Sequence, residues 1–295
     1  MLDLNRYSMA ARILALKMTG QVGPRAFQTL LTHFKTVDNI LLAEKEEFEE
    51  IDGIGPVRSR ALFEADTHLD KAQSTVDNLE ASDTGVVTCF DDAFPEMLHE
   101  LNDPPPLLYY QGRLPQADEK RVAIIGSQAV SAEGIGDAVK FAKHLAREGV
   151  AIIGGLARGI DAAGHTGALK ADGATFAALP CGFNQIYPPE NTALSREITR
   201  RGGLISEYLP DIQVADGRLL ARNRLTIALS QAVVIGEVAP DSVGTMDAAL
   251  CCHQLGKLLF VIVGQSNPHY DQLAAYGAVP LTNINEYGMI LKSLV

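Results

Sequence analysis

Two continuous apolar segments in the middle of the chain, VAIIGS at 122–127 and VAIIGG at 150–155, each end in small residues. Buried parallel strands have this pattern, because helices cover both of their faces. Between the two segments, Ala138, Phe141 and Leu145 recur at helical spacing. The pattern therefore predicts a strand–helix–strand unit. Small residues at the carboxyl ends of its strands leave backbone amides and helix N-termini open to anionic ligands.

The same alternation continues toward the end of the chain. Further strands are predicted in ATFAALPCG (174–182), LISEY (204–208), AVVIGE (232–237) and KLLFVIVG (257–264). Helices are predicted between them at about 192–200, 225–229 and 244–255, and the tail 269–295 predicts a helix, a brief strand and a final helix. Strands alternating with helices beyond residue 120 predict the α/β class with a doubly wound, mostly parallel sheet.

The amino-terminal part has a different pattern, and residues 1–66 predict a small all-helical domain. Two glycine–proline turns, at 20–24 and 53–56, each lead into an apolar helix. The second turn fits a helix-hairpin-helix, whose exposed amides can hold a DNA phosphate. The acidic segment EKEEFEEID at 44–52 would repel phosphate, which favours a compact helical adaptor that uses the turn for packing.

A polar helix at 67–82 is predicted to link this domain to a larger one at 83–295. Short strands are predicted in GVVTCF (85–90) and LLYYQG (107–112), and the proline-rich segment 91–106 between them marks a boundary.

Composition narrows the classes of function. The 295 residues are 47% hydrophobic, which is enough for a sizeable core. The four cysteines have neither CxxC nor zinc-ligand spacing, so we expect free thiols and no metal. The amino terminus has no basic region followed by an uninterrupted apolar segment, and the longest apolar runs are strand-length, which predicts a cytoplasmic protein without a membrane partner. A net charge of −11 argues against coating duplex DNA by charge alone but allows a local basic groove.

Three glycine turns and one basic cluster are expected to meet at the carboxyl edge of the predicted sheet. The turns are Gly126-Ser127, the segment 154–161 and Gly244-Thr245, and the cluster is Arg218, Arg222 and Arg224 around Asn223, expected on an exposed turn ahead of an apolar helix. Arginines beside unpaired amides suit phosphate. No turn is a Walker A loop or a GxGxxG fingerprint, so neither ATP hydrolysis nor NAD binding is supported, and no cofactor is expected.

Asp161 and His165 lie one helical turn apart and allow two interpretations. They can form an acid/base pair, or Asp161 can cap the glycine turn while His165 hydrogen-bonds nearby. No nucleophile is placed beside them, which favours the second interpretation. The loop around Pro188-Pro189 likewise either lines the ligand edge or braces it, through Asn184, Tyr187, Glu190 and Asn191.

Several segments taken together resemble the DNA processing protein A (DprA/Smf) family, over nearly all of the chain. They are FPEMLHELNDPPPLLYYQG, IIGS, GGLARGIDAAGH, LPCG followed by IYPPEN, ISEY and RNRLTIALS. The resemblance implies a helical SAM or helix-hairpin-helix-like domain and an extended Rossmann-like domain. It also implies a non-enzymatic protein that binds and protects single-stranded DNA, dimerises, and helps to load a RecA-type recombinase during natural transformation.

The chain departs from the family pattern at four places. Gln128 stands where the family usually has arginine, and Leu219-Leu220 stands where it has an aromatic residue and proline. Val243-Gly244-Thr245 replaces Ser-Gly-Ser, and the sequence ends at Val295 without the winged-helix domain that many members carry. These departures predict weaker DNA binding than in a member that keeps the arginine and the aromatic residue.

The predicted DNA site combines amides, arginines and polar side chains. Phosphates are expected to be held by the amides near Gly126, Ser127, Gly155 and Gly159, and charge to be supplied by Arg158, Arg222 and Arg224. The strand is expected to be oriented by Asn223 and Thr245, and the site to be completed by Gln128, Arg218 and Gly244. Asp161 and His165 are expected to support the site. One alternative is a nucleotide-processing enzyme similar to the LOG phosphoribohydrolases. Their PGGxGTxxE motif aligns with 240–248, where the two adjacent glycines and the glutamate of the motif are absent. A third interpretation is a recombinase-binding scaffold that has lost strong DNA binding.

Overall fold

A computed structural model describes residues 2–215, 217–239, 242–263 and 270–294 of the chain. It divides into two compact units, one formed by 1–94 with 102–109 and the other by 95–101 with 110–295. Three of the expectations above reach beyond the described residues. They are the motif comparison at 240–248, through residues 240 and 241, the strand at 257–264, through residue 264, and the tail at 269–295, through residues 269 and 295. The domain boundaries at 66 and 82 stay predictions.

The first unit is mainly helical, as its sequence predicts. Its helices are η1 (Leu4–Arg6), α1 (Met9–Met18), α2 (Pro24–Phe34), α3 (Val37–Leu42), α4 (Lys45–Glu49), α5 (Pro56–Phe63), η2 (Glu64–His68) and α6 (Leu69–Ala81). Both glycine–proline turns start a helix, with Pro24 and Pro56 in the first turn, where the missing N–H costs nothing. The unit also holds β1 (Gly85–Thr88) and the start of β2 (Leu107–Gly112).

The second unit contains a parallel sheet with the strand order β6-β5-β4-β3-β7-β8-β9. These strands are β3 (Arg121–Ile125), β4 (Ala151–Gly154), β5 (Thr175–Leu179), β6 (Gly203–Ser206), β7 (Ala232–Ile235), β8 (Leu258–Ile262) and β9 (Val279–Leu281). Every residue of β3, β4, β5 and β7 is buried, which explains their continuous apolar sequences. The predicted doubly wound α/β fold is confirmed.

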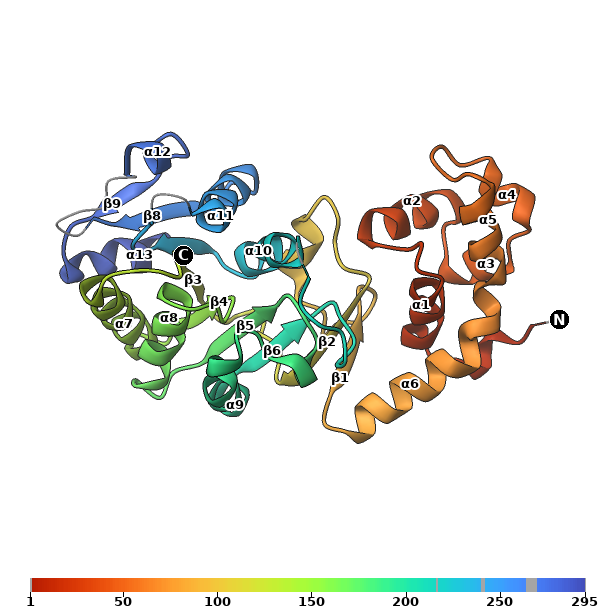
Figure 1. Cartoon of the computed structure of the whole chain (residues 1–295), viewed down its shortest axis with the longest axis horizontal. Coiled ribbons are helices and arrows are strands. Elements are labelled where there is room, and N and C mark those ends of the chain that lie inside the picture. The colour runs from red at the N-terminus through yellow and green to blue at the C-terminus, as the bar shows by residue number, and fades with distance from the viewer. Residues whose placement is uncertain (1, 216, 240–241, 264–269, 295) are drawn as a thin grey trace. The chain divides into compact units, whose positions relative to one another are not determined.

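Helices cover both faces of this sheet. The described helices of the second unit are η3 (Glu96–Glu100), α7 (Ala132–Arg147), α8 (Ile160–Leu169), η4 (Phe183–Gln185), η5 (Pro189–Asn191), α9 (Thr192–Arg201), α10 (Arg218–Ala228), α11 (Val243–Gln254), α12 (Tyr270–Ala274), η6 (Ile284–Glu286) and α13 (Tyr287–Ser293). Figure 1 shows α7, α8 and α9 on one side of the strands and α10 and α11 on the other. From β3 the chain adds β4, β5 and β6 on one side of β3, and then β7, β8 and β9 on the other side. The strand order therefore reverses between β3 and β7. Ligands bind at such a reversal in open α/β sheets.

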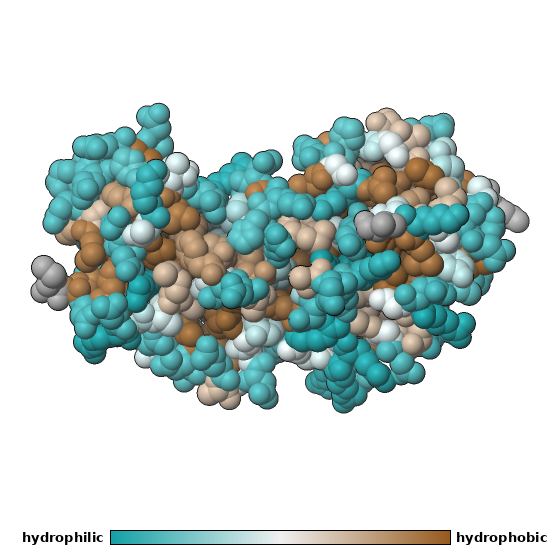
Figure 2. Space-filling view, turned by 180° about the vertical axis from the view of Figure 1, so that it is seen from behind, coloured by the Kyte–Doolittle hydropathy of each residue, from teal (hydrophilic) through white to brown (hydrophobic). Residues whose placement is uncertain are grey.

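The surface of the chain is mixed. Figure 2 shows hydrophobic side chains exposed in patches between hydrophilic ones. In the second unit the exposed large apolar residues include Leu220, Val243, Leu250, Leu258 and Met289. Among the described residues, no helix is long and apolar enough to cross a membrane.

Candidate nucleic-acid interface

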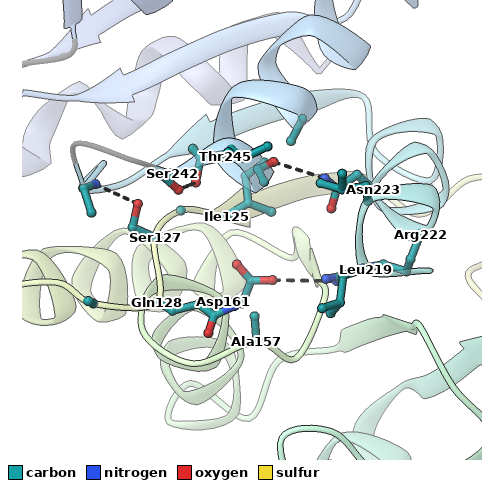
Figure 3. Close-up of a pocket in the computed structure, with 17 residues that line it drawn as sticks. Ile125, Ser127, Gln128, Ala157, Asp161, Leu219, Arg222, Asn223, Ser242 and Thr245 are labelled. Atoms are coloured by element: carbon teal, nitrogen blue, oxygen red, sulfur yellow. Dashed lines mark hydrogen bonds and ion pairs between the residues drawn. The ribbon is translucent and has the colours of Figure 1, made fainter. Parts of the chain in front are cut away.

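A pocket of about 410 Å³ opens at the point where the strand order reverses. We call it the edge pocket. Its walls come from the segment after β3, the start of α8, the amino-terminal half of α10 and the segment around the start of α11 (Figure 3). Segments far apart in the sequence therefore converge at the predicted edge of the sheet.

The edge pocket contains some of the predicted site residues but not others. Gly126, Ser127, Gln128, Asp161, Arg222, Asn223, Gly244 and Thr245 line it. Gly155, Arg158, Gly159, Arg218, Arg224 and His165 do not. Leu219 and Leu220 also line it, so the positions that depart from the family pattern face the same space.

The basic cluster differs from its predicted form, because its arginines lie inside α10 rather than on an exposed turn ahead of a helix. Arg222 is buried, with its Nη1 atom 3.8 Å from the Asp161 carboxylate and 3.3 Å from the Ala178 carbonyl oxygen. A Cβ atom at Gly155 would lie 1.0 Å from that Nη1 atom, so glycine is needed there for the guanidinium to fit. The expectation of an exposed Arg222 is wrong, because this arginine is needed to compensate a buried carboxylate.

Asp161 organises the glycine turn from within. Its carboxylate accepts a hydrogen bond of 2.8 Å from the Gly155 amide. Burial raises the pKa of Asp161, and Arg222 together with the amides of Gly155, Gly126 and Ala157 opposes that rise. The interpretation of Asp161 as the cap of the turn is confirmed. Two amides that the sequence assigns to phosphate, those of Gly126 and Gly155, therefore already face a carboxylate of the same chain.

His165 is fully buried behind this turn and does not reach the edge pocket. Its Nδ1 atom lies 2.7 Å from the Thr175 hydroxyl oxygen. Burial lowers the pKa of His165 to about 3, and the nearby Arg222 adds to this effect. The ring is therefore neutral and held in place, which agrees with a supporting role and not with an acid/base pair.

The buried imidazole makes the stability of the protein depend on pH. His165 stays neutral in the folded chain down to pH about 3, whereas in the unfolded chain it binds a proton below its ordinary pKa of 6.5. Its contribution to the free energy of unfolding is therefore complete above pH 6.5 and is lost at about 1.4 kcal/mol per pH unit as the pH falls below that value. Urea unfolding of the wild type and of His165→Gln between pH 7 and about 5 measures this. Equal pH slopes for the two proteins would contradict it.

Two other arginines near the edge are also matched to carboxylates, whereas Arg218 donates to the Gln213 carbonyl oxygen and lies over the Tyr208 ring. Arg224 donates to both oxygens of Glu207, at 2.7 and 2.9 Å. Arg158 is paired with Glu190, and both side chains are about half exposed, at 44% and 49%. Carboxylates of the same chain therefore neutralise much of the positive charge predicted at the edge of the sheet. The Arg158–Glu190 pair is more exposed than the Arg224–Glu207 pair.

The polar side chains of the edge pocket hold its walls together. The Asn223 amide nitrogen donates to the Gly244 carbonyl oxygen at 3.1 Å and to Asp247 at 2.9 Å. The Ser127 hydroxyl oxygen accepts from the Ala239 amide at 2.7 Å, and the hydroxyl oxygens of Thr245 and Ser242 are 2.6 Å apart. Gln128 is exposed at the rim. These contacts fix the segments after β3 and β7 against α10.

Sequence reasoning missed the acidic side of the site. Glu207 follows β6 directly, and Glu237 lies two residues beyond β7, where it accepts from the Ser131 amide at 3.0 Å. Both come just after buried strands, in the segments ISEY and VIGE. Because the carboxyl ends of parallel strands meet at one edge, both glutamates were recognisable as part of the site, and Glu207 as a partner for an arginine.

Comparison with known proteins identifies the family. The sequence model of the family described as DNA recombination-mediator protein A matches residues 85–288. The chain belongs to this family. Among curated relatives, Protein Smf of Synechocystis is 31% identical over 84% of this chain. The chain spans 63% of the length of that relative. The DNA processing protein DprA of Streptococcus pneumoniae is 34% identical over 59% of this chain and 61% of its own length.

Solved structures of the same family have the same fold. DNA processing protein A of Streptococcus pneumoniae has a TM-score of 0.79 and 26% identity, covering 95% of this chain and 97% of its own. The corresponding protein of Helicobacter pylori has a TM-score of 0.65 and 31% identity, covering 72% of this chain and 97% of its own. The Helicobacter pylori structure concerns that protein's single-stranded DNA binding mode. The resemblance to the DprA/Smf family drawn from the sequence is thus confirmed.

Proposed function

We propose that the protein binds single-stranded DNA at the edge pocket and acts as a binding protein rather than an enzyme. The observation that carries the proposal is the convergence of the segments after β3 and β7 with α10 on one pocket, in a chain of this family. The relative from Helicobacter pylori, which binds single-stranded DNA, supports the choice of ligand. The predicted DNA-site residues that line this pocket are proposed as its contacts, except that Arg222 acts by holding Asp161 and the Gly126 amide faces the same carboxylate.

The strand is held mainly by groups at the rim. Gln128 offers its amide to a phosphate or sugar oxygen. Arg158, on the segment between β4 and α8 beside the pocket, reaches a phosphate when that phosphate replaces Glu190. Leu220, 39% exposed, gives a base an apolar surface to pack on in place of an aromatic ring. Few net charges take part, so the affinity is modest.

Further proposals follow from the family alone. They are delivery of a RecA-type recombinase to single strands, protection of incoming DNA during natural transformation, action in the cytoplasm and assembly into a homodimer. Exposed Leu250, Leu258 and Met289 provide apolar area that a second copy can cover. Light scattering at micromolar concentration tests the dimer, and a mass of 31.7 kDa, that of one chain, would contradict it.

A salt titration of DNA binding tests the central proposal. We expect single strands to bind more tightly than duplex of the same length and with little sequence preference, because the proposed polar contacts are to phosphate and sugar, which carry no sequence information. The logarithm of the affinity falls with the logarithm of salt by about 0.7 for each phosphate held on a single strand. Equal affinity for the two forms would refute the proposal.

One variant sharpens this titration. Gln128→Arg adds a cation at the pocket rim, so the salt slope is expected to steepen by about 0.7 and the affinity for single strands to rise. Gln254→Arg adds the same charge to an exposed residue at the end of α11, which does not line the pocket. An equal gain in both variants would mean that overall charge, rather than the edge pocket, controls binding.

The geometry does not favour the LOG-like enzyme. His165 is buried and bonded to Thr175, and Asp161 is occupied by Arg222 and the glycine turn. Neither side chain is available to act on a bound nucleotide as an acid/base pair.

A further inference from the structure

A second pocket, of about 440 Å³, lies beside α9 in the second unit and shares no lining residue with the edge pocket. We call it the α9 pocket. It is lined by Gln111, Phe183, Asn184, Gln185, Ile186, Pro189, Thr192, Ser195, Arg196, Thr199 and Leu204. Buried Phe183 and Leu204 form an apolar side, and amides, hydroxyls and one guanidinium form the rest. This mixture of an apolar surface and a few polar groups is typical of a small-ligand site.

One face of α9 supplies the polar wall. Thr192, Ser195 and Thr199 follow one another at helical spacing. Their hydroxyls donate to the carbonyl oxygens of Pro189, Thr192 and Ser195, at 2.6, 2.9 and 2.8 Å. A hydroxyl whose proton is used in this way still has lone pairs, so the wall accepts hydrogen bonds. The amino groups of nucleobases are donors that match such a wall.

Arg196, on the same face, is the charged residue of the α9 pocket. It is exposed, and within the part of the chain that the structure describes it has no carboxylate partner. Arg158, Arg222 and Arg224 at the edge are all paired with carboxylates, as is Arg200, one turn further along α9. A guanidinium without a carboxylate partner is well suited to bind phosphate.

The wall between the two pockets consists of the segments 156–158 and 186–191, which are joined by side-chain contacts. Ala157 lines the edge pocket, and its carbonyl oxygen and that of Leu156 accept from the Asn191 amide at 3.4 and 2.8 Å. The residues just before Asn191 include Ile186 and Pro189 of the α9 pocket. On the same pair of loops, the Arg158 guanidinium lies 6.0 Å from the centre of the Tyr187 ring. A cation and an aromatic ring thus lie on the loops that separate the pockets.

We propose that the α9 pocket is a second nucleotide subsite for the same DNA strand, which crosses the wall past Arg158 and Tyr187. Arg196 holds a phosphate, and the acceptors of α9 face the base. This inference rests on the proposed single-stranded DNA binding at the edge pocket and adds the direction in which the strand continues. A bare inorganic anion would use Arg196 alone, so the ligand is a nucleotide within a strand.

The test compares two charge-removing variants of the same helix. Arg196→Gln removes the guanidinium from the α9 pocket, and Arg200→Gln removes one that is 71% exposed, paired with Glu197 and outside the pocket. Binding to oligonucleotides of about 4 and about 16 nucleotides is followed by fluorescence anisotropy, since single-strand sites span such lengths. Inorganic phosphate is added as a competitor, and thermal unfolding confirms that both variants fold.

For Arg196→Gln we expect about tenfold weaker binding of the long strand, a salt slope shallower by about 0.7, and little change for the short strand, which the edge pocket still holds. Arg200→Gln is expected to match the wild type for both strands. Equal losses in the two variants, equal losses for both lengths, or full competition by millimolar phosphate would overturn the α9 subsite. Failure of the wild type to bind any single strand would instead overturn the proposed function, and the wild-type titration shows this on its own.

Discussion

Replacing Arg222 with alanine is expected to lower the free energy of unfolding by about 3–5 kcal/mol, the usual cost of leaving one charge of a buried pair uncompensated. Both side chains of the Arg222–Asp161 pair are only 6% exposed. Without the guanidinium, the Asp161 carboxylate keeps the Gly155 amide but loses its counter-charge. Urea unfolding followed by circular dichroism gives the change as a shift of the midpoint at constant slope.

Two further variants separate this cause from a general loss of packing. Arg158→Ala removes an arginine from a half-exposed ion pair and should cost less than about 1 kcal/mol. Arg222→Ala combined with Asp161→Asn removes both charges of the buried pair, so it should be more stable than Arg222→Ala alone. If the single and double variants were equally unstable, the buried charge would not be the cause. If Arg222→Ala were as stable as the wild type, the pair would not support the fold.

Gly159→Ala is expected to destabilise the protein and to abolish binding at the edge pocket together. Gly159 precedes α8 with φ of 72° and ψ of −121°, which residues with a side chain rarely adopt. A Cβ atom there would also lie 2.3 Å from the Ser127 carbonyl oxygen and 2.7 Å from that of Gln128. The backbone at Ser127 and Gln128, which forms the pocket wall, must therefore move.

Gly149→Ala is the matched control. Gly149 has a φ of 78°, but a Cβ atom there would have no neighbour within 4 Å. It therefore carries only the backbone cost of about 1–2 kcal/mol, and DNA affinity should be unchanged. Gly159→Ala carries a similar backbone cost and, in addition, the clash with the Ser127 and Gln128 carbonyl oxygens. We therefore expect its free energy of unfolding to fall by at least about 3 kcal/mol and its single-strand binding to be too weak to measure. Similar stability and affinity in the two variants would show that the Gly159 approach does not shape the pocket.

The sheet was predictable because burial on both faces leaves a clear trace in the sequence. The continuous apolar runs at 122–125 and 150–153 supply most of β3 and β4, and the structure places these two strands side by side in parallel register. Helix boundaries depend more on local chemistry. The helix expected at 225–229 begins at Arg218, because arginine and leucine favour a helix as readily as the later apolar residues do.

The charges of the site were harder to predict, since a sequence shows which ions exist but not which ones meet. Arg222 and Arg224 are two positions apart in α10, yet one is matched to Asp161 after β4 and the other to Glu207 after β6. Such pairings depend on strand order, which places the ends of distant strands next to one another. The cap formed by Asp161 was more accessible to sequence reasoning, because it is local to its own glycine turn.

The internal pairing of the arginines also affects how quickly a DNA strand arrives. A chain with a net charge of −11 in which Arg158, Arg222 and Arg224 already face carboxylates has little long-range attraction for a polyanion. Encounter should therefore proceed without electrostatic steering, at about 10⁵–10⁶ M⁻¹s⁻¹, and depend only weakly on salt. Duplex DNA, RNA and other polyanions gain no kinetic advantage from their charge alone. Discrimination among them is then set by residence time in the pocket, after Glu190 has yielded Arg158 to a phosphate.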